Sequence, residues 1–234
     1  PQLAALLVGT QMSAMTTAQV AALTTAQIVA LTTLQASQLS SAQVAAMSTA
    51  QIAAIETVDF AKISTAALSG LTAEQSAKLT TDQIVALTTT QASQLSATSS
   101  GALTSAQVAA LETVDLANLS TDAIQALTTS ALAGLSAANQ VAKLTTTQIG
   151  ALSSAQISSL STAQVTALVT AQTNKLSSDQ ISALTTAQLV AMTTAGVAAL
   201  TTNAISSTTT AQAAKLTTAQ IVALTTAQTA ALST

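Results

Sequence analysis

Hydrophobic and polar residues recur along this chain with a period of eight residues. From Met15 the chain reads MTTAQVAA, LTTAQIVA, LTTLQASQ, LSSAQVAA and MSTAQIAA, so the repeated unit, called here the octad, is roughly L-[ST]-[ST]-A-Q-[IV]-x-A. A large apolar residue opens each octad from Met15 to Leu135, and the register resumes at Leu144 and runs to Leu232, with Thr208 as the polar exception. The pattern predicts one nearly uninterrupted repeat array.

Two places depart from this register. One extra residue falls in LSAANQVAK at 135–143, and the octad at 95–102 is the least regular, so we expect a kink or a loosened coil there. Residues 1–14 form an irregular lead-in, and residues 15–234 form the continuous array. Because neither end carries the polar capping unit that a free-standing array needs for solubility, we expect a fragment or a subunit of a longer array.

A single long helix does not fit this period. At about 100° per residue, eight residues overshoot two helical turns by roughly 80°, so the leucines would spiral around the helix instead of facing one core. A β-solenoid is the alternative, favoured by Thr, Ile and Val. In a strand, however, the first and sixth places of the octad would face opposite sides, and the abundant Ala and Gln favour helix.

Short helices fit every place of the octad. The second to fifth places read [ST]-x-x-Q, which is a capping box: the hydroxyl caps the helix start, and Gln reaches back to the N–H of the cap. The first-place Leu and the sixth-place Ile or Val then form a hydrophobic staple across that start. We therefore predict one helix of about six residues, roughly 9 Å long, in each octad.

The placement of the charged residues supports these helix boundaries independently. All acids lie in the second to fifth places of an octad and all lysines close one, which the helix dipole favours. The acids are Glu56, Asp59, Glu74, Asp82, Glu112, Asp115, Asp122 and Asp179, and the lysines are Lys62, Lys78, Lys143, Lys175 and Lys215.

Helices this short are unstable alone because helix nucleation is costly. The sequence therefore predicts an all-α solenoid, a superhelical coil of very short helices, with the β-solenoid as the alternative fold. We expect the first-place Leu and the sixth-place Ile or Val to point inward, and Thr, Ser and Gln to point outward. Stability should be distributed along the array.

The composition excludes many classes of functional site. The chain lacks Cys and His, only 6% of its residues are charged, and Phe60 is its single aromatic residue. Without Cys there is no disulfide or thiolate metal site, and without His the commonest metal ligand and pH-7 base is missing. Five lysines and no arginine form no basic patch for nucleic acid, and no run of about 20 apolar residues predicts a membrane span. We expect a protein that is not an enzyme and needs no cofactor.

The clustered carboxylates are Glu56 with Asp59 and Glu112 with Asp115, in the segments ETVDFA and ETVDLA, which start 56 residues apart and indicate block duplication. Ca²⁺ takes about six to eight oxygen ligands, and few others lie nearby, so we interpret these carboxylates as helix-start charges. Phe60 occupies a sixth place, where we expect it in the core. We assign no catalytic, cofactor-binding or metal-ligating residue.

Segments such as LTTAQIVALTTAQ and AALETVDLANLSTDAIQAL resemble the Ala/Thr/Gln-rich octapeptide tracts of very large secreted or surface repeat proteins of Gram-negative bacteria, which are often labelled adhesin-like. The resemblance covers nearly the whole chain. It implies an extracellular or cell-surface location. The chain lacks the Gly-rich nonapeptides of calcium-binding repeats, so calcium dependence is not implied.

These observations favour a structural role. We expect an extracellular filament, fibre or stalk built by stacking of octads and capable of self-association. The recurrent hydroxyls are candidate sites for O-linked glycans. The alternative function is a surface-binding module, ice-binding or adhesive, that uses arrayed Thr side chains.

Overall fold

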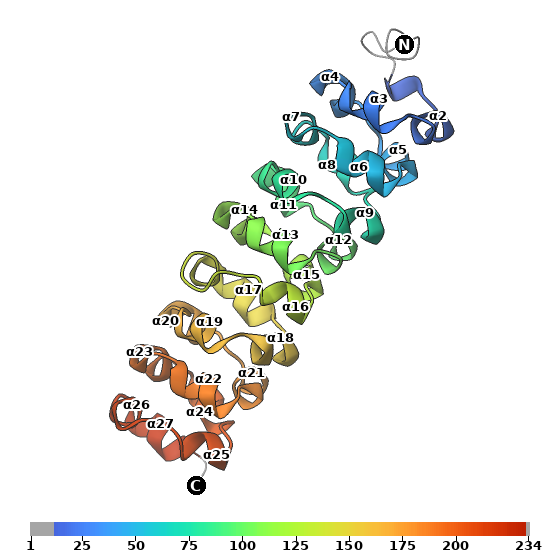
Figure 1. Ribbon diagram of the computed structural model, residues 1–234. Coiled ribbons are helices and arrows are strands. Elements are labelled where there is room, and N and C mark those ends of the chain that lie inside the picture. Colours follow the sequence, from blue (N-terminus) through green and yellow to red (C-terminus); the bar gives the residue numbers. More distant parts are fainter. Residues whose placement is uncertain (1–11, 233–234) are drawn as a thin grey trace. The chain divides into compact units, whose positions relative to one another are not determined.

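The computed structural model describes residues 12–232, and within that range the chain folds entirely into short helices (Figure 1). These residues contain 26 short α-helices, two 3₁₀-helices and no strand. The prediction of an all-α solenoid with one short helix per octad is confirmed, and the β-solenoid alternative is wrong for the described residues.

The chain divides into two compact units, the first ending at Leu127 and the second beginning at Thr128. The helices of the first unit are η1 (Met12–Ala14), α2 (Thr17–Ala21), α3 (Thr25–Val29), α4 (Thr33–Ser37), α5 (Ser41–Ala46), α6 (Thr49–Ala54), α7 (Thr57–Phe60), α8 (Thr65–Leu68), α9 (Ala73–Ala77), α10 (Thr81–Val85), α11 (Thr89–Ser93), α12 (Ala97–Gly101), α13 (Ser105–Ala110), α14 (Thr113–Asn118) and α15 (Thr121–Ala126).

The second unit continues the same pattern. Its helices are α16 (Thr129–Leu132), η2 (Val141–Lys143), α17 (Thr146–Ala151), α18 (Ser154–Ser159), α19 (Thr162–Thr166), α20 (Thr170–Thr173), α21 (Ser178–Ala183), α22 (Thr186–Ala191), α23 (Thr194–Ala198), α24 (Thr202–Ser206), α25 (Thr210–Ala213), α26 (Thr218–Val222) and α27 (Thr226–Ala231).

The predicted capping box starts most of these helices. At α10 the backbone N–H of Gln83 donates to Oγ1 of Thr80 (3.1 Å), and Oε1 of Gln83 accepts from the backbone N–H of Thr80 (3.0 Å). Thr80 itself is extended, with φ −73° and ψ 156°, so the helix begins at the next residue. Each such box thereby satisfies two backbone N–H groups at a helix start, where partners within the helix are missing.

The first-place residue ends one helix and leads into the next. Leu152, which follows α17, has φ −59° and ψ 137°, and its backbone N–H donates to the carbonyl of Ile149. This extended residue directs the chain away from the helix axis, and Ser153 then caps α18. The corner needs neither Gly nor Pro, which is why the repeat can be built almost wholly from Ala, Ser, Thr, Gln and aliphatic residues.

Within each unit, a helix packs against the third helix after it along the chain. In the first unit α2 packs on α5, α3 on α6 and α4 on α7; in the second, α18 packs on α21 and α21 on α24. Figure 1 shows α4 and α7 in succession along one side of the first unit. Successive octads therefore form a coil that returns to the same side after slightly more than three of them.

The interior of the coil holds the residues that the pattern predicts. Sixth-place side chains such as Ile52, Ile84 and Ile149 are fully buried, and first-place side chains such as Leu87 and Leu152 are almost so. Second-place Ser and Thr side chains are exposed throughout the described residues, apart from the half-buried Ser96. The inward and outward assignments are thus confirmed for these three places of the octad.

The two irregular places are both accommodated. In the 95–102 octad, α12 forms with Ser96 as its cap, so one helix per octad is retained there. At 135–143, Oε1 of Gln140 accepts from the backbone N–H of Ser136, four residues back instead of three (2.9 Å), and η2 follows. The inserted residue is therefore absorbed in the first turn of one octad. Of the predicted 1–14 lead-in, residues 1–11 lie outside the described residues.

Candidate functional site

The fifth-place glutamines from Gln35 onward are buried, with exposed fractions of only 1–4%, so the prediction that they face outward is wrong for them. The two before them differ, since Gln19 is exposed and Gln27 half-buried. A buried amide without hydrogen-bond partners would be unfavourable. The structure supplies those partners from the preceding coil.

Gln83 shows the arrangement. While its Oε1 completes the capping box of its own helix, its Nε2 donates to the carbonyl oxygens of Ile52 (2.8 Å) and Ile55 (2.9 Å). These carbonyls lie 31 and 28 residues earlier, at the corner where the helix α6 ends. One side chain therefore completes the start of its own helix and bonds to carbonyls at the end of a helix in the coil below. The carbonyl of Ile52 also accepts from the backbone N–H of Ile55, so the amide is a second donor there.

The same contact recurs along both units, and we call it the glutamine ladder. Its members donate through Nε2 to corner carbonyls of the preceding coil. They are Gln43, Gln51, Gln75, Gln83, Gln91 and Gln107 in the first unit, and Gln164, Gln172, Gln180, Gln188, Gln212, Gln220 and Gln228 in the second.

The ladder also passes over the inserted residue. Gln164 donates to the carbonyls of Leu132 and Leu135, 32 and 29 residues earlier, because the insertion lies between donor and acceptors. Gln172 is already back at the usual separations of 31 and 28, with the carbonyls of Val141 and Leu144. The inter-coil contact is thus fixed by spatial register and not by a fixed count of residues.

Some octads carry a small residue in place of the ladder glutamine. Ala67 is one of them, and three residues later Gly70 closely approaches the coil below. A Cβ atom added at Gly70 would lie 2.1 Å from the backbone oxygen of Ser41. The close approach therefore requires glycine at this position.

Asp59 and Asp115 also replace ladder glutamines. Both lie in the first turn of their helices, as the charge pattern predicts, but both are buried, with exposed fractions of 2% and 1%. Their place at the helix starts agrees with the interpretation as helix-start charges, whereas their burial was not predicted. The other acids of the chain are exposed.

Burial raises the pKa of the Asp115 carboxyl above its ordinary value, and the nearby Glu112 adds to that rise. The hydroxyl of Thr89 opposes the shift by donating to Oδ1 of Asp115 (2.8 Å), while Oδ2 is buried without a partner. Burial, followed by the charge of Glu56, likewise raises the pKa of Asp59. Both carboxyls consequently favour the protonated form more than a free aspartate does.

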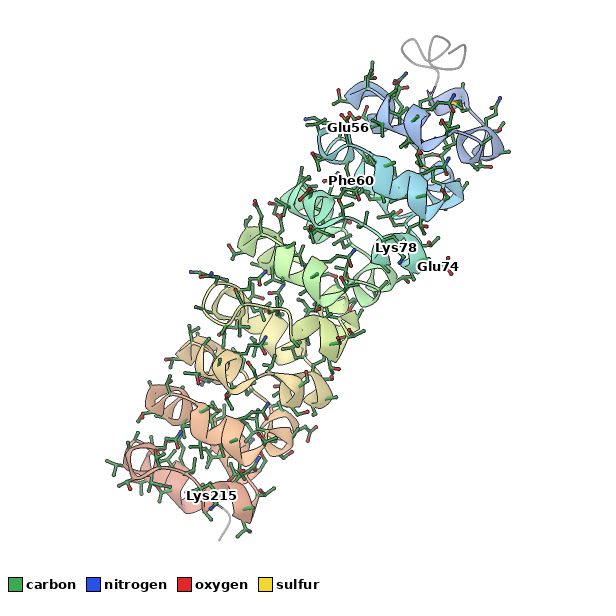
Figure 2. All side chains as sticks on the ribbon, in the orientation of Figure 1. Glu56, Phe60, Glu74, Lys78 and Lys215 are labelled. Atoms are coloured by element: carbon green, nitrogen blue, oxygen red, sulfur yellow. The ribbon has the colours of Figure 1, made fainter. Side chains whose placement is uncertain are left out.

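The paired acids do not form one carboxylate surface. Glu56 and Glu112 occupy the exposed N-cap positions of α7 and α14, and neither side chain makes a capping hydrogen bond. Figure 2 shows Glu56 near the start of α7 together with Phe60. Phe60 is fully buried, which confirms its predicted place in the core.

Lysines lie at or just beyond helix ends, and all five are exposed, as expected from the helix dipole. Glu74 and Lys78 project from the first turn and the end of α9 (Figure 2). Between residues 12 and 232, no three His, Cys, Asp or Glu side chains come together as a metal-binding group. In the same range, no helix has both the length and the apolar character needed to cross a membrane.

Sequence reasoning missed the glutamine ladder because the capping box already accounts for the glutamine. The box uses Oε1 and leaves the two hydrogens of Nε2 without acceptors. Every glutamine-bearing octad therefore has an amide donor that the capping box does not use, and the last carbonyls of a helix lack partners within that helix. Together, these two features could have indicated contact between coils.

The repeat has a recognised sequence family. The ALTTAQ repeat matches residues 52–89, 108–146, 141–178 and 174–209. No curated protein has a significantly matching sequence. The matched segments cover more than half of the chain, and they contain capping boxes and ladder glutamines described above. The chain belongs to the ALTTAQ repeat family.

Proposed function

We propose that this chain is a structural repeat protein that acts outside the cell, as the shaft of a filament, fibre or stalk. The observation that carries the proposal is the glutamine ladder. In both units it joins successive coils through buried hydrogen bonds. A fold held by such local contacts can be extended along its axis without needing a large central core.

The composition fits this role. Each regular octad contributes only two larger apolar side chains to the interior, while its second-place hydroxyl faces solvent. Charged groups are few, and the two buried acids occur at ladder positions, where they replace a structural side chain. These features support a scaffold more than a catalyst, because general acid–base chemistry needs accessible titratable groups near a substrate.

The extracellular location is part of the proposal. It is supported by the resemblance to octapeptide tracts of secreted and surface proteins and by the absence of Cys from the sequence. The exposed second-place Ser and Thr side chains provide regularly spaced positions for O-linked glycans. Intact mass spectrometry of the protein from its natural source tests this part: a mass equal to the bare polypeptide, 23.0 kDa for these residues, would remove the glycans from the proposal.

Small-angle X-ray scattering of the purified chain tests the structural role. A shaft of stacked coils predicts an elongated particle whose cross-section stays constant when further octads are added genetically. Its maximum dimension should increase in proportion to the number of added octads. A compact particle, or one that grows in all dimensions with added octads, would refute the proposal.

A further inference from the structure

Asp59 and Asp115 leave two gaps in the glutamine ladder of the first unit. A ladder glutamine donates to the carbonyls 31 and 28 residues earlier, and the carbonyls at these separations from Asp115 belong to Ile84 and Leu87. No side chain of the described residues donates to either of them. A carboxylate has no hydrogen to donate, so the ionised aspartate cannot supply the missing bonds.

The carboxyl of Asp115 nevertheless reaches this corner of the preceding coil. Its Oδ1 accepts from the hydroxyl of Thr89 (2.8 Å), and Thr89 lies two residues beyond Leu87. Its Oδ2 is buried and has no hydrogen-bond partner, and the whole side chain is only 1% exposed. An unpartnered carboxyl oxygen is thus held at the corner whose carbonyls the ladder leaves without a side-chain donor.

The ionised form of Asp115 also has no compensating positive charge. The helix α11, which packs on α14, carries no titratable residue. The charged neighbour of Asp115 is Glu112 at the N-cap of α14, and its negative charge opposes ionisation. Asp122, in the following helix α15, is exposed. Burying a charge without a partner is unfavourable, whereas a protonated carboxyl carries one O–H donor.

Asp59 repeats this arrangement 56 residues earlier. Its side chain is 2% exposed, and no side chain of the described residues donates to the carbonyls 31 and 28 residues before it. Its charged neighbour is Glu56, again at an N-cap. Of the helices that pack on α7, α4 carries no titratable residue and α10 carries the exposed Asp82, while Lys62, beyond the end of α7, is exposed. Both duplicated segments therefore bury an acid in place of a ladder amide.

We propose that Asp59 and Asp115 make two contacts between coils dependent on pH. In the protonated form, each carboxyl donates its O–H to a corner carbonyl of the preceding coil, in the place of a ladder glutamine. When the proton is released to solvent, this donor is lost and a charge remains in the interior, so the coils separate locally more often. The inference goes beyond the proposed structural role, because it adds two acid-stabilised joints to the array.

Hydrogen exchange measured by mass spectrometry tests the proposal on the unmodified chain and the Asp115→Gln variant. Glutamine restores the amide that the ladder uses, and comparing both chains at the same pH removes the intrinsic pH dependence of exchange. At about pH 7.5 the unmodified chain should exchange faster in residues 84–89 and 112–118. At about pH 3.5, below the ordinary aspartate pKa of about 3.9, the ratio of the two rates should be several-fold smaller, because each pH unit between the unfolded and folded pKa changes it by up to about tenfold.

Two matched comparisons separate this contact from general effects of charge. Asp122→Gln removes an exposed carboxylate from the next octad, and its rate ratio to the unmodified chain should not change with pH. Thr89→Val removes the hydroxyl that favours the ionised form of Asp115, so exchange at about pH 7.5 should increase further. In a chain that also carries Asp115→Gln, this additional increase should be absent.

Circular dichroism establishes that each variant retains its helices, and Asp59→Gln, followed in residues 56–61, provides the same comparison at the second joint. A ratio between the unmodified and glutamine chains that is independent of pH at both joints would overturn the proposal. A Thr89→Val effect that persists beside Asp115→Gln would also overturn it, because the hydroxyl would then act through another group. Neither result bears on whether the chain is elongated, so the scattering experiment tests the proposed structural role separately.

Discussion

Replacing one ladder glutamine by glutamate separates its two hydrogen-bonding roles. In the Gln180→Glu variant, the carboxylate keeps an oxygen that can accept from the backbone N–H of Ser177, which now bonds Oε1 of Gln180 at 2.8 Å. The variant loses both donated bonds, from Nε2 to the carbonyls of Ile149 (2.9 Å) and Leu152 (2.6 Å). The helix start is preserved, and the contact between coils is removed.

The expected loss of stability follows from burial. Leaving a buried polar partner unsatisfied costs about 1–3 kcal/mol, and placing an unpaired charge there raises the total to about 3–5 kcal/mol. The matched control is Gln19→Glu, which introduces the same charge at the same octad place on an exposed side chain. A surface substitution of this kind changes stability by about 0.5 kcal/mol or less.

The pH dependence provides a second check. Burial should raise the pKa of the carboxyl introduced at position 180 above the unfolded value of about 4.3. The folded state then binds the proton more strongly, so stability falls as pH rises through this interval and recovers on acidification. A protonated carboxyl can also donate one hydrogen bond to a corner carbonyl.

Urea unfolding followed by circular dichroism at about pH 7.5 and about pH 4.5, on either side of the raised pKa, measures these effects. Hydrogen exchange of the amides near residue 180 shows whether the loss is local, as expected in a repeat array where contacts join only neighbours. Equal stability of the Gln180→Glu and Gln19→Glu chains at the higher pH would refute the argument. So would a loss in Gln180→Glu that is unchanged at the lower pH.

Two further substitutions test the exceptions to the ladder. Because burial raises the pKa of Asp115, the folded state binds its proton more strongly than the unfolded state does, and stability falls as pH rises above about 3.9. Asp115→Asn should therefore raise stability at neutral pH, with the gain vanishing as the pH falls below the ordinary aspartate pKa of about 3.9, whereas the same substitution at the exposed Asp122 is the control and should bring no gain in thermal unfolding. Gly70→Ala should destabilise by about 1–3 kcal/mol in urea unfolding, because its Cβ meets the backbone of Ser41. The control Gly150→Ala, inside α17 and with its nearest contact at 3.7 Å, should instead stabilise by about 0.5–1 kcal/mol.

The local structure was predictable because the residues of each octad specify where its helix begins and ends. Thr80 and Gln83 form the capping box that their spacing predicts, and Ile84 lies in the interior as the sixth place requires. These interactions lie within one octad, so a single copy of the repeat contains the information. Because these interactions recur in octads throughout the chain, they disfavour any other secondary structure.

The contact between coils was not predictable in the same way. Gln83 bonds to the carbonyl of Ile55, 28 residues earlier, which depends on how many octads complete a coil. That number follows from the backbone angles at every corner, and small differences accumulate over several octads. The sequence also suggested an exposed glutamine, because Gln is usually a surface residue, and only the geometry shows that its amide is fully used.

A uniform ladder leaves one ambiguity that the exceptions resolve. If every octad were identical, a coil of three octads and a coil of four would offer each glutamine equivalent carbonyls, and the chain could adopt both. Two departures from the repeat bear on this choice. The observed register brings the backbone of Ser41 so close to residue 70 that only glycine fits there, and it gives the buried Asp115 a hydroxyl donor from Thr89. Because the observed coil accommodates both departures, they favour it over the competing coil. Octads that depart from the repeat therefore contribute to specifying a single fold.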